Sequence, residues 1–337
     1  MDRQYSFLVL TDHGLHHERN PIYSLLPQLR KHPQCSEVHV ASRTNSRNEN
    51  FFQTYSSYVC EVLEIKEGFR FDESGKQFFD TGIVREVDSY DCILMRLPRP
   101  VERQFMEFVA KLDHQVVFIN HPLGIEATSN KAFLTNFPKL CPPMKLCFSI
   151  NEILKFASNF PIVLKPLKEY GGKGLLKIEH DSLFEGETEH PTIDYLLKHE
   201  SYINTEGYLA MKFMKNVREG DKRIVLVGRN IMGASLRLPP EGSWICNVAQ
   251  GGTSIAAELT PGEKEIIWQI LPFLEERGVF IAGVDTLLGD HGKRVLSEIN
   301  TLSVGGFLNI QEQSGQPVLA RTVQNIIDYV HQKSRNR

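Results

Sequence analysis

The sequence predicts an α/β protein with a parallel sheet in its first part and a β-rich second part. Residues before about 122 alternate short β-type runs with helical patterns, which is typical of a parallel sheet covered by helices. The chain of 337 residues also exceeds the size at which one hydrophobic core usually stops growing. Two or more domains are therefore expected.

The first part supplies its elements in order. The expected strands are the short apolar runs "FLVLTD", "EVHVAS", "DCILMR" and "QVVFIN". Between them, "IYSLLPQLRKH" and "RQFMEFVAKL" repeat apolar residues at helical spacing. Residues 43–90 are less regular, and we assign them no structure.

The pattern changes after "INHP". Helices are expected around Lys131, over residues 150–158 and over about 261–277, and "PVLARTVQNIIDYVHQ" is expected to be the last helix. From about residue 160 to 300, β-type runs otherwise dominate: "FPIVLKP", "GLLKIE", "GYLAMKFM", "KRIVLVGRNIMGASLRL", "VFIAGVDTLL" and "RVLSEIN".

Composition excludes several classes of function. With 41% hydrophobic residues, 23% charged residues and a net charge of -3, the chain resembles neither a disordered protein nor a general nucleic-acid binder. The first apolar run is too short for a signal peptide, and no run reaches membrane-spanning length. Six scattered cysteines without a C-x-x-C pair argue against zinc and against a disulfide framework, so we expect a cytoplasmic protein.

Oxygen-bearing side chains follow the late strands. In "RVLSEIN", Glu298 and Asn300 are two residues apart and share one face of a strand. Asp285 lies in the preceding strand, "VFIAGVDTLL". Each residue alone also fits a solvated strand end. Together, and with nucleotide phosphates, their oxygens would complete the octahedral shell that magnesium requires.

A lysine and a glycine-rich turn lie upstream. In "VLKPLKEYGGKGLLKI", Lys165 ends one strand, and a turn from Gly171 to Gly174 leads into the next. Backbone N–H groups of such a turn can hold phosphate oxygens, because glycine leaves room for close approach. The spacing matches neither a Walker A loop nor the dinucleotide fingerprint, and alone such a turn is more often a plain hairpin.

The order of these motifs resembles the ATP-grasp ligases, most closely prokaryotic glutathione synthetase. The resemblance covers about residues 90–310 and includes "INHPLGIEATSNKAFL", "REGDKRIVLVGRN", "NVAQGGTSIAAELT" and "LSEIN". It implies a Rossmann-like pre-ATP-grasp domain at residues 1–122 and an ATP-grasp domain at 123–337. The latter would comprise two α+β subdomains, a small lid at about 145–212 and a catalytic subdomain at about 213–337.

The resemblance also implies roles for individual residues. ATP would be bound by Lys131, Lys165, Gly171, Gly172, Gly174, Lys212, Phe213, Met214 and Asp221, with the backbone of residues 212–214 facing adenine. Magnesium, as two ions and replaceable by manganese, would be held by Asp285, Glu298 and Asn300. Catalytic roles fall to Arg223, Arg237 and Asn247, and substrate contacts to Asp12, Arg96, Ser303, Gly305 and Gly306. Arg223 could instead simply pair with Asp221.

The implied reaction joins a carboxylate to an amine through an acylphosphate, under a lid at residues 239–254. γ-Glutamylcysteine and glycine are the first expected substrates. Another small peptide, an amino acid or a protein tail is the alternative, as is a regulatory protein that binds nucleotide without turnover. Retention of both lysines and all three magnesium ligands speaks against the last. A homo-oligomer is expected by analogy only.

The pattern departs from the family where the acid and the amine bind. Ile245 replaces an arginine, "TLSVGGF" replaces a Ser-Pro-Thr type turn, and Arg96 lacks the acidic residue that often follows it. The run "DHGLHHERN" after the first strand does not match H-E-x-x-H. We expect it to line a substrate crevice or a solvated loop.

Overall fold

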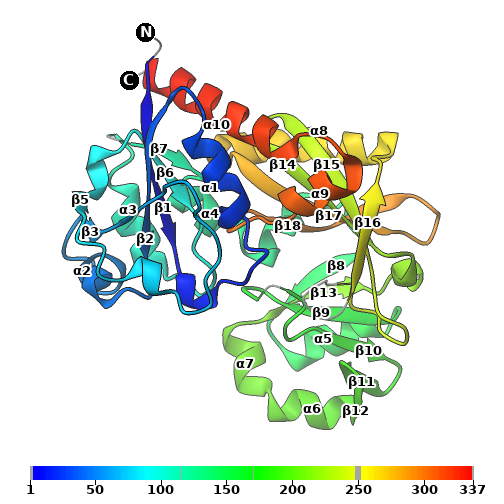
Figure 1. The fold of residues 1–337 in the computed structure, drawn as a ribbon. Coiled ribbons are helices and arrows are strands. Elements are labelled where there is room, and N and C mark those ends of the chain that lie inside the picture. Colours follow the sequence, from blue (N-terminus) through cyan, green and yellow to red (C-terminus); the bar gives the residue numbers. More distant parts are fainter. Residues whose placement is uncertain (1–2, 115, 170, 247–251, 336–337) are drawn as a thin grey trace.

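The computed structural model describes residues 3–114, 116–169, 171–246 and 252–335. These residues form three large sheets and one two-stranded sheet, each large sheet accompanied by helices (Figure 1). The predicted α/β fold class is thereby confirmed. None of the helices in the described ranges is long and apolar enough to cross a membrane. All six cysteines are free thiols.

The N-terminal sheet has the strand order β4-β2-β1-β6-β7 and is parallel except for β4. Its central strand is buried on both faces, which explains the continuous apolar run in the sequence. The predicted strands and helices are confirmed as β1 (Tyr5–Thr11), β2 (Cys35–Ser42), β6 (Cys92–Met95), β7 (Val117–Ile119), α1 (Ile22–Arg30) and α3 (Arg103–Ala110).

The irregular residues 43–90 form only short elements. They are α2 (Glu49–Phe52), β3 (Val59–Glu61), β4 (Leu63–Glu64), β5 (Val84–Glu86) and 3₁₀ turns. The helix expected around Lys131 proves to be two pieces, α4 (Pro122–Thr128) and the 3₁₀ helix η5 (Lys131–Asn136).

The middle sheet is wholly antiparallel, in the order β12-β11-β10-β9-β13-β8. Its strands are β8 (Met144–Cys147), β9 (Ile162–Pro166), β10 (Leu176–Glu179), β11 (Ser182–Glu185), β12 (Thr188–Pro191) and β13 (Tyr208–Lys212). The predicted helix α5 (Ile150–Ala157) accompanies it. The expected dominance of β-type runs missed α6 (Thr192–Lys198) and α7 (Glu200–Thr205), because helices of seven and six residues are too short to show helical spacing.

The C-terminal sheet is antiparallel, in the order β16-β15-β14-β17-β18. Its strands are β14 (Asp221–Val227), β15 (Asn230–Leu238), β16 (Thr253–Ala257), β17 (Ile281–Leu288) and β18 (Arg294–Asn300). Helices α8 (Pro261–Glu276) and α10 (Val318–Arg335) were predicted, and α9 (Phe307–Ser314) was not. The domain boundaries proposed above remain predictions.

Helix α10 joins the N-terminal and C-terminal sheets. It runs beside α1 and over β14 and β15 (Figure 1). One hydrophobic core contains apolar side chains of β1, α1, β14, α9 and α10. The hydroxyl of Tyr5 on β1 also lies 2.6 Å from Nδ1 of His331 on α10. The two sheets therefore share one hydrophobic core on these faces.

A completely buried carboxylate ties α8 to the C-terminal sheet. Glu263 lies in a capping box with Thr260, accepts from Lys222 Nζ at 2.8 Å and accepts from Thr286 Oγ1 at 2.8 Å. Burial alone would raise the pKa of Glu263, but the bonds from Lys222, Thr260 and Thr286 hold it below its ordinary value of 4.5. The carboxylate is thus ionised and fully partnered in the fold.

We predict that Glu263→Gln lowers the free energy of unfolding by about 3 kcal/mol at neutral pH, because it leaves the Lys222 ammonium buried without its counter-charge. The folded pKa of Glu263 is depressed, so its contribution is present above the unfolded pKa and is lost as the pH falls through the folded pKa. Urea denaturation at several pH values measures both effects. Glu265→Gln, on the exposed side of the same helix, is the matched control; equal stability of the two variants would refute the prediction.

Candidate active site

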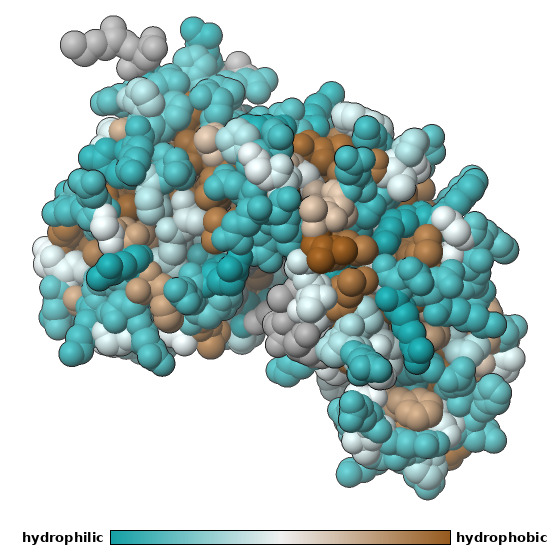
Figure 2. All heavy atoms as spheres, turned by 45° about the vertical axis from the view of Figure 1, so that its right-hand side comes forward, coloured by the Kyte–Doolittle hydropathy of each residue, from teal (hydrophilic) through white to brown (hydrophobic). Residues whose placement is uncertain are grey.

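A cavity of about 410 Å³ lies between the middle and C-terminal sheets. Strands β9 and β13 line it from one side, and β14, β15, β17 and β18 from the other. Residues 98–99, which follow β6 of the N-terminal sheet, and residues 301–305, which follow β18, also line it. Figure 2 shows the lobe of the middle sheet standing apart from the larger body, with apolar side chains near their junction.

Cross-strand register brings the charged residues of the C-terminal sheet together. Arg223 on β14 pairs with Asp285 on β17, and Asp285 pairs with Glu298 on β18. Asn300 follows Glu298 by two residues and donates to Asp285 Oδ2 at 3.2 Å. Asp221 on β14 stands opposite Arg237 on β15. Since cross-strand neighbours share a face, these side chains converge on the cavity.

Two arginines surround Asp285, which is only 2% exposed. Arg223 donates to both of its carboxylate oxygens, and Arg237 Nη2 lies 3.0 Å from its Oδ2. Arg237 also donates to both oxygens of Asp221, at 2.7 and 2.5 Å. The alternative pairing of Arg223 with Asp221 is therefore wrong, since Arg237 takes that place.

The arginines determine the charge of the two carboxylates. Burial alone would raise the pKa of Asp285, but Arg223 and Arg237 hold it well below its ordinary value. For Asp221, burial dominates over Arg237 and raises the pKa. Asp285 is thus the firmly ionised member of the group, and it faces the place where a cation would bind.

A β-bulge positions Lys165. The register of β17 and β18 shifts after Asp285, so that Ser297 is the extra residue on β18. Lys165 on β9 donates to the carbonyl of Ser297 at 3.1 Å, and the pKa of this lysine is lowered by burial. Lys131 lies close by, because its Nζ contacts Glu298 Oε1 at 3.4 Å and donates to the carbonyl of Glu169. Two lysines thus meet the acidic strand end.

The backbone of residues 212–214 has one N–H group left for a ligand. The N–H of Lys212 donates to Pro143 O and that of Phe213 donates to Pro161 O, both at 2.8 Å. The N–H of Met214 has no acceptor among the described residues, and Met214 lines the cavity. Apolar side chains form the surrounding walls, namely Val163, Leu175, Met211, Val217 and Leu287.

Chain segments from two sides reach this apolar end. Gly171 and Gly172 line the cavity with φ of 67° and 78°, which favours glycine at both positions. On the opposite side, Trp244 packs edge-on against Phe213 with ring centroids 6.0 Å apart. The lid predicted at residues 239–254 lies partly outside the described residues, because 247–251 are not included.

A model of the prokaryotic glutathione synthetase ATP-grasp domain matches residues 130–315, more than half of the chain. Glutathione synthetase from Nitrosomonas europaea is 30% identical over 271 residues, which cover 78% of this chain and 81% of that protein. This chain belongs to the prokaryotic glutathione synthetase family. The Brucella melitensis glutathione synthetase is likewise 30% identical, over 240 residues that cover 70% and 73% of the two chains.

Solved structures support the ATP-grasp fold of the family. D-cycloserine synthetase DcsG superposes with a TM-score of 0.67 at 12% identity, covering 96% of this chain and 99% of that one. The ATP-grasp ligase PsnB, solved with a minimal precursor, Mg and ADP, gives 0.59 at 12% identity, covering 98% and 100%. At this identity the likeness establishes the fold alone. Together with the family match, this makes the chain an ATP-grasp ligase related to glutathione synthetase.

Most residues expected from the family resemblance line this one cavity. They are Lys131, Lys165, Gly171, Gly172, Lys212, Phe213, Met214, Asp221, Arg223, Arg237, Asp285, Glu298, Asn300, Ser303 and Gly305. Gly174, Asp12, Arg96 and Gly306 are absent from the lining, and Asn247 lies outside the described residues. Their individual roles remain predictions.

Sequence reasoning missed several lining residues. Val163, Met211 and Leu287 are apolar strand residues, and from the sequence they cannot be distinguished from core residues. Arg99 lines the opposite end and donates to the carbonyl and hydroxyl of Ser129, both at 2.6 Å. Its signal was present in the sequence, since a cation between two prolines lies in the loop that follows a parallel strand.

We predict that Met214→Pro weakens binding of AMPPNP with Mg²⁺ about tenfold. Proline removes the one N–H group of residues 212–214 that is available to adenine. The φ of -85° at Met214 lies near the range that proline accepts. Isothermal titration calorimetry measures the affinity, and Met214→Ala, which keeps the N–H, is the control. Equal affinity of the two variants would contradict this hydrogen bond.

Proposed function

We propose that this chain is an ATP-dependent carboxylate–amine ligase that forms an amide bond through an acylphosphate. The observation that carries the proposal is the mixed charge of the cavity. Six lysine or arginine residues and four aspartate or glutamate residues line it, an excess of two positive charges. Such a lining suits anionic ligands that are bound together with a cation.

The oxygen set at the ends of β17 and β18 fits magnesium. Asp285, Glu298 and Asn300 supply carboxylate and amide oxygens, and Mg²⁺ prefers hard oxygen ligands together with phosphates and water. The described residues contain no group of three or more His, Cys, Asp or Glu placed for a metal, so phosphate oxygens and water would complete the shell. Two ions, with Mn²⁺ as a substitute, remain part of the proposal. When bound, the ions would neutralise charge on the phosphates.

The protein's own part is to position the reactants and to stabilise charge. Lys131 and Lys165 would hold the phosphates, and the N–H of Met214 would orient adenine at the other end of the cavity. Arg223 and Arg237 would meet the charge that develops when a carboxylate attacks the γ-phosphate. No described side chain needs to form a covalent bond to the substrate. Exclusion of water would protect the acylphosphate until the amine attacks.

γ-Glutamylcysteine and glycine are the proposed substrates, on the strength of the 30% identity to curated glutathione synthetases. A buried cation also lies next to the cavity lining. Arg96 is 7% exposed, forms no ion pair within the described chain and donates to the carbonyl of Val304, a lining residue. Burial lowers its pKa to about 10, and Nε has no partner among the described residues. Ile245 and residues 301–306 differ from the family pattern, so another small acid or a peptide tail is the alternative.

The decisive experiment is ADP release by the purified protein with Mg²⁺, ATP, γ-glutamylcysteine and glycine, omitting each component in turn. The proposal requires release that depends on both substrates and stops when EDTA removes the metal. Release that needs neither substrate would contradict the proposed pair. A panel of other amino acids and dipeptides would then identify the acid and the amine. The proposal also places the protein in the cytoplasm, where free thiols persist.

We predict that Asn300→Ala lowers kcat for ADP release more than about 100-fold. Loss of a residue that only supports a metal ligand costs up to roughly 100-fold, and loss of a ligand itself should cost more. Asn300 is only half-buried, so the fold should survive its truncation. Asn230→Ala, at an exposed position on the same sheet, is the control. Unchanged kcat in a folded Asn300→Ala protein would remove Asn300 from the metal site.

A further inference from the structure

The segment from Leu97 to Pro100 is a thin wall between two cavities. Pro98 and Arg99 line the candidate active site, beside residues 301–305. Leu97 and Pro100 line a second cavity of about 570 Å³ on the other side, together with Arg43. Whatever fixes this wall from behind therefore also fixes the part of the active-site surface that Pro98 and Arg99 form.

The wall cannot hold itself in place by ordinary backbone pairing. Its sequence is Leu-Pro-Arg-Pro, and neither proline has an N–H group to donate to a neighbouring strand. Its carbonyl groups still require donors. Side chains supply them: Arg43 Nη1 donates to Pro100 O at 2.5 Å and Nη2 to Pro98 O at 3.4 Å, and Ser303 Oγ donates to Leu97 O at 2.8 Å.

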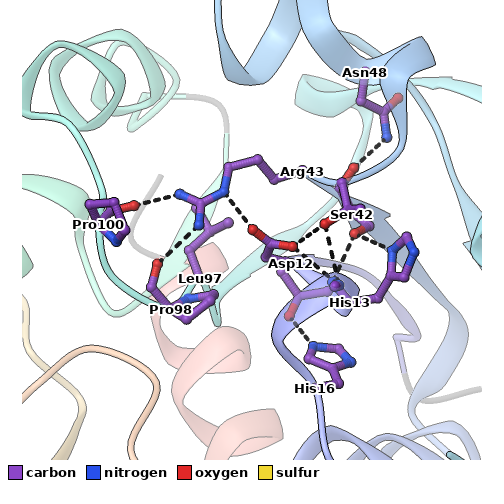
Figure 3. Close-up of polar contacts among 12 residues, drawn as sticks. Asp12, His13, His16, Ser42, Arg43, Asn48, Leu97, Pro98 and Pro100 are labelled. Carbon is purple, nitrogen blue, oxygen red and sulfur yellow. Dashed lines mark hydrogen bonds and ion pairs between the residues drawn. The ribbon is translucent and has the colours of Figure 1, made fainter. Parts of the chain in front are cut away.

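Asp12 orients the guanidinium of Arg43 toward these carbonyl groups (Figure 3). Arg43 Nε donates to Asp12 Oδ2 at 2.8 Å, which leaves both terminal nitrogens directed at the wall. The other carboxylate oxygen accepts from the hydroxyl of Thr44 and from Gly14 N at 3.2 Å. The side chains are 11% and 21% exposed for Asp12 and Arg43, so water screens this pair only weakly.

This geometry changes the role expected for Asp12. The carboxylate has three donors within the protein, and Asp12 does not line the active-site cavity. The same strand-end run contains His13 and His16, and both rings are engaged in the fold: His13 Nδ1 with Ser42 Oγ at 2.7 Å, and His16 with Thr11 and Tyr23. These contacts connect the run to the wall and to the loop beneath it, and they favour an indirect role for Asp12 over a direct substrate contact.

We propose that Asp12 and Arg43 form a positioning pair that sets affinity for the non-nucleotide acid by holding residues 97–100 against the active site. The inference deepens the proposed ligase function and rests on it. Arg43 is suited to this task because its planar fork presents donors in fixed directions to three acceptors at once. A lysine would keep the charge next to Asp12 but would lose the fork.

The test is Arg43→Lys, with KM for γ-glutamylcysteine, KM for ATP and kcat measured by ADP release. We expect KM for the acid to rise about tenfold, because a displaced wall misaligns one reactant. KM for ATP should stay within about twofold, because Arg43 contacts Asp12, Pro98 and Pro100 and none of the residues proposed to bind ATP. Arg103→Lys, at an exposed i,i+4 pair with Glu107, is the matched control. An unchanged KM for the acid, or an equal rise in both KM values, would overturn the proposal.

A double-mutant cycle separates positioning from direct contact. If Asp12 acts only through Arg43, Asp12→Asn combined with Arg43→Lys should raise KM for the acid no more than the larger single change does. Additive effects would mean that Asp12 acts on the substrate independently, and would refute the pair. Asn keeps an oxygen acceptor for Thr44 and Gly14, so the loop beneath retains its hydrogen bonds.

Failure of the proposed ligase function can be distinguished from failure of the positioning pair. If the wild-type protein releases no ADP with γ-glutamylcysteine and glycine, the proposed substrates are wrong whatever the variants do. The pair is then judged by hydrogen exchange of the amides of Leu97, Arg99 and Val101, with AMPPNP and Mg²⁺ bound. Faster exchange there in Arg43→Lys, with unchanged AMPPNP affinity, supports the positioning pair. Unchanged exchange overturns it.

Discussion

The register of the C-terminal sheet is the constraint on which the site depends. A buried carboxylate such as Asp285 is stable only beside cations, and it finds them because Arg223 stands directly opposite it and Arg237 lies one strand further on. A slip of one residue would turn these side chains to the other face and leave buried charges without partners. The same interactions that create the site therefore also stabilise the pairing of β14, β15 and β17.

The three sheets contribute in different ways to one cavity. The C-terminal sheet provides the charged row, the middle sheet provides Lys165 and part of the apolar walls, and residues 98–99 after β6 of the N-terminal sheet complete the lining. The N-terminal and C-terminal sheets are held together because α10 packs into a core that they share. Asn120 adds polar contacts across the same junction, donating to the carbonyls of Ile281 and Thr301 at 2.7 Å each.

Local sequence patterns predicted the fold class and most of the long elements, because their apolar spacing is a property of a few neighbouring residues. The shared face of Glu298 and Asn300 was predictable for the same reason. Pairings between distant residues could not be predicted. Arg43 is 31 residues from Asp12, and no local pattern in either segment shows that the Asp12 carboxylate accepts a hydrogen bond from Arg43. The choice of Arg237 over Arg223 as partner of Asp221 likewise depends on strand order, which spacing along the chain does not encode.

The shared core also bears on how the chain is made. Tyr5, Phe7 and Leu25 are packed in the same cluster as Leu319, Val323 and Ile327, more than 290 residues later. During synthesis from the N-terminus, α1 can cover part of this face early, but the part that α10 covers becomes buried only after α10 has left the ribosome. The N-terminal sheet consequently reaches its full packing only when the last helix is available.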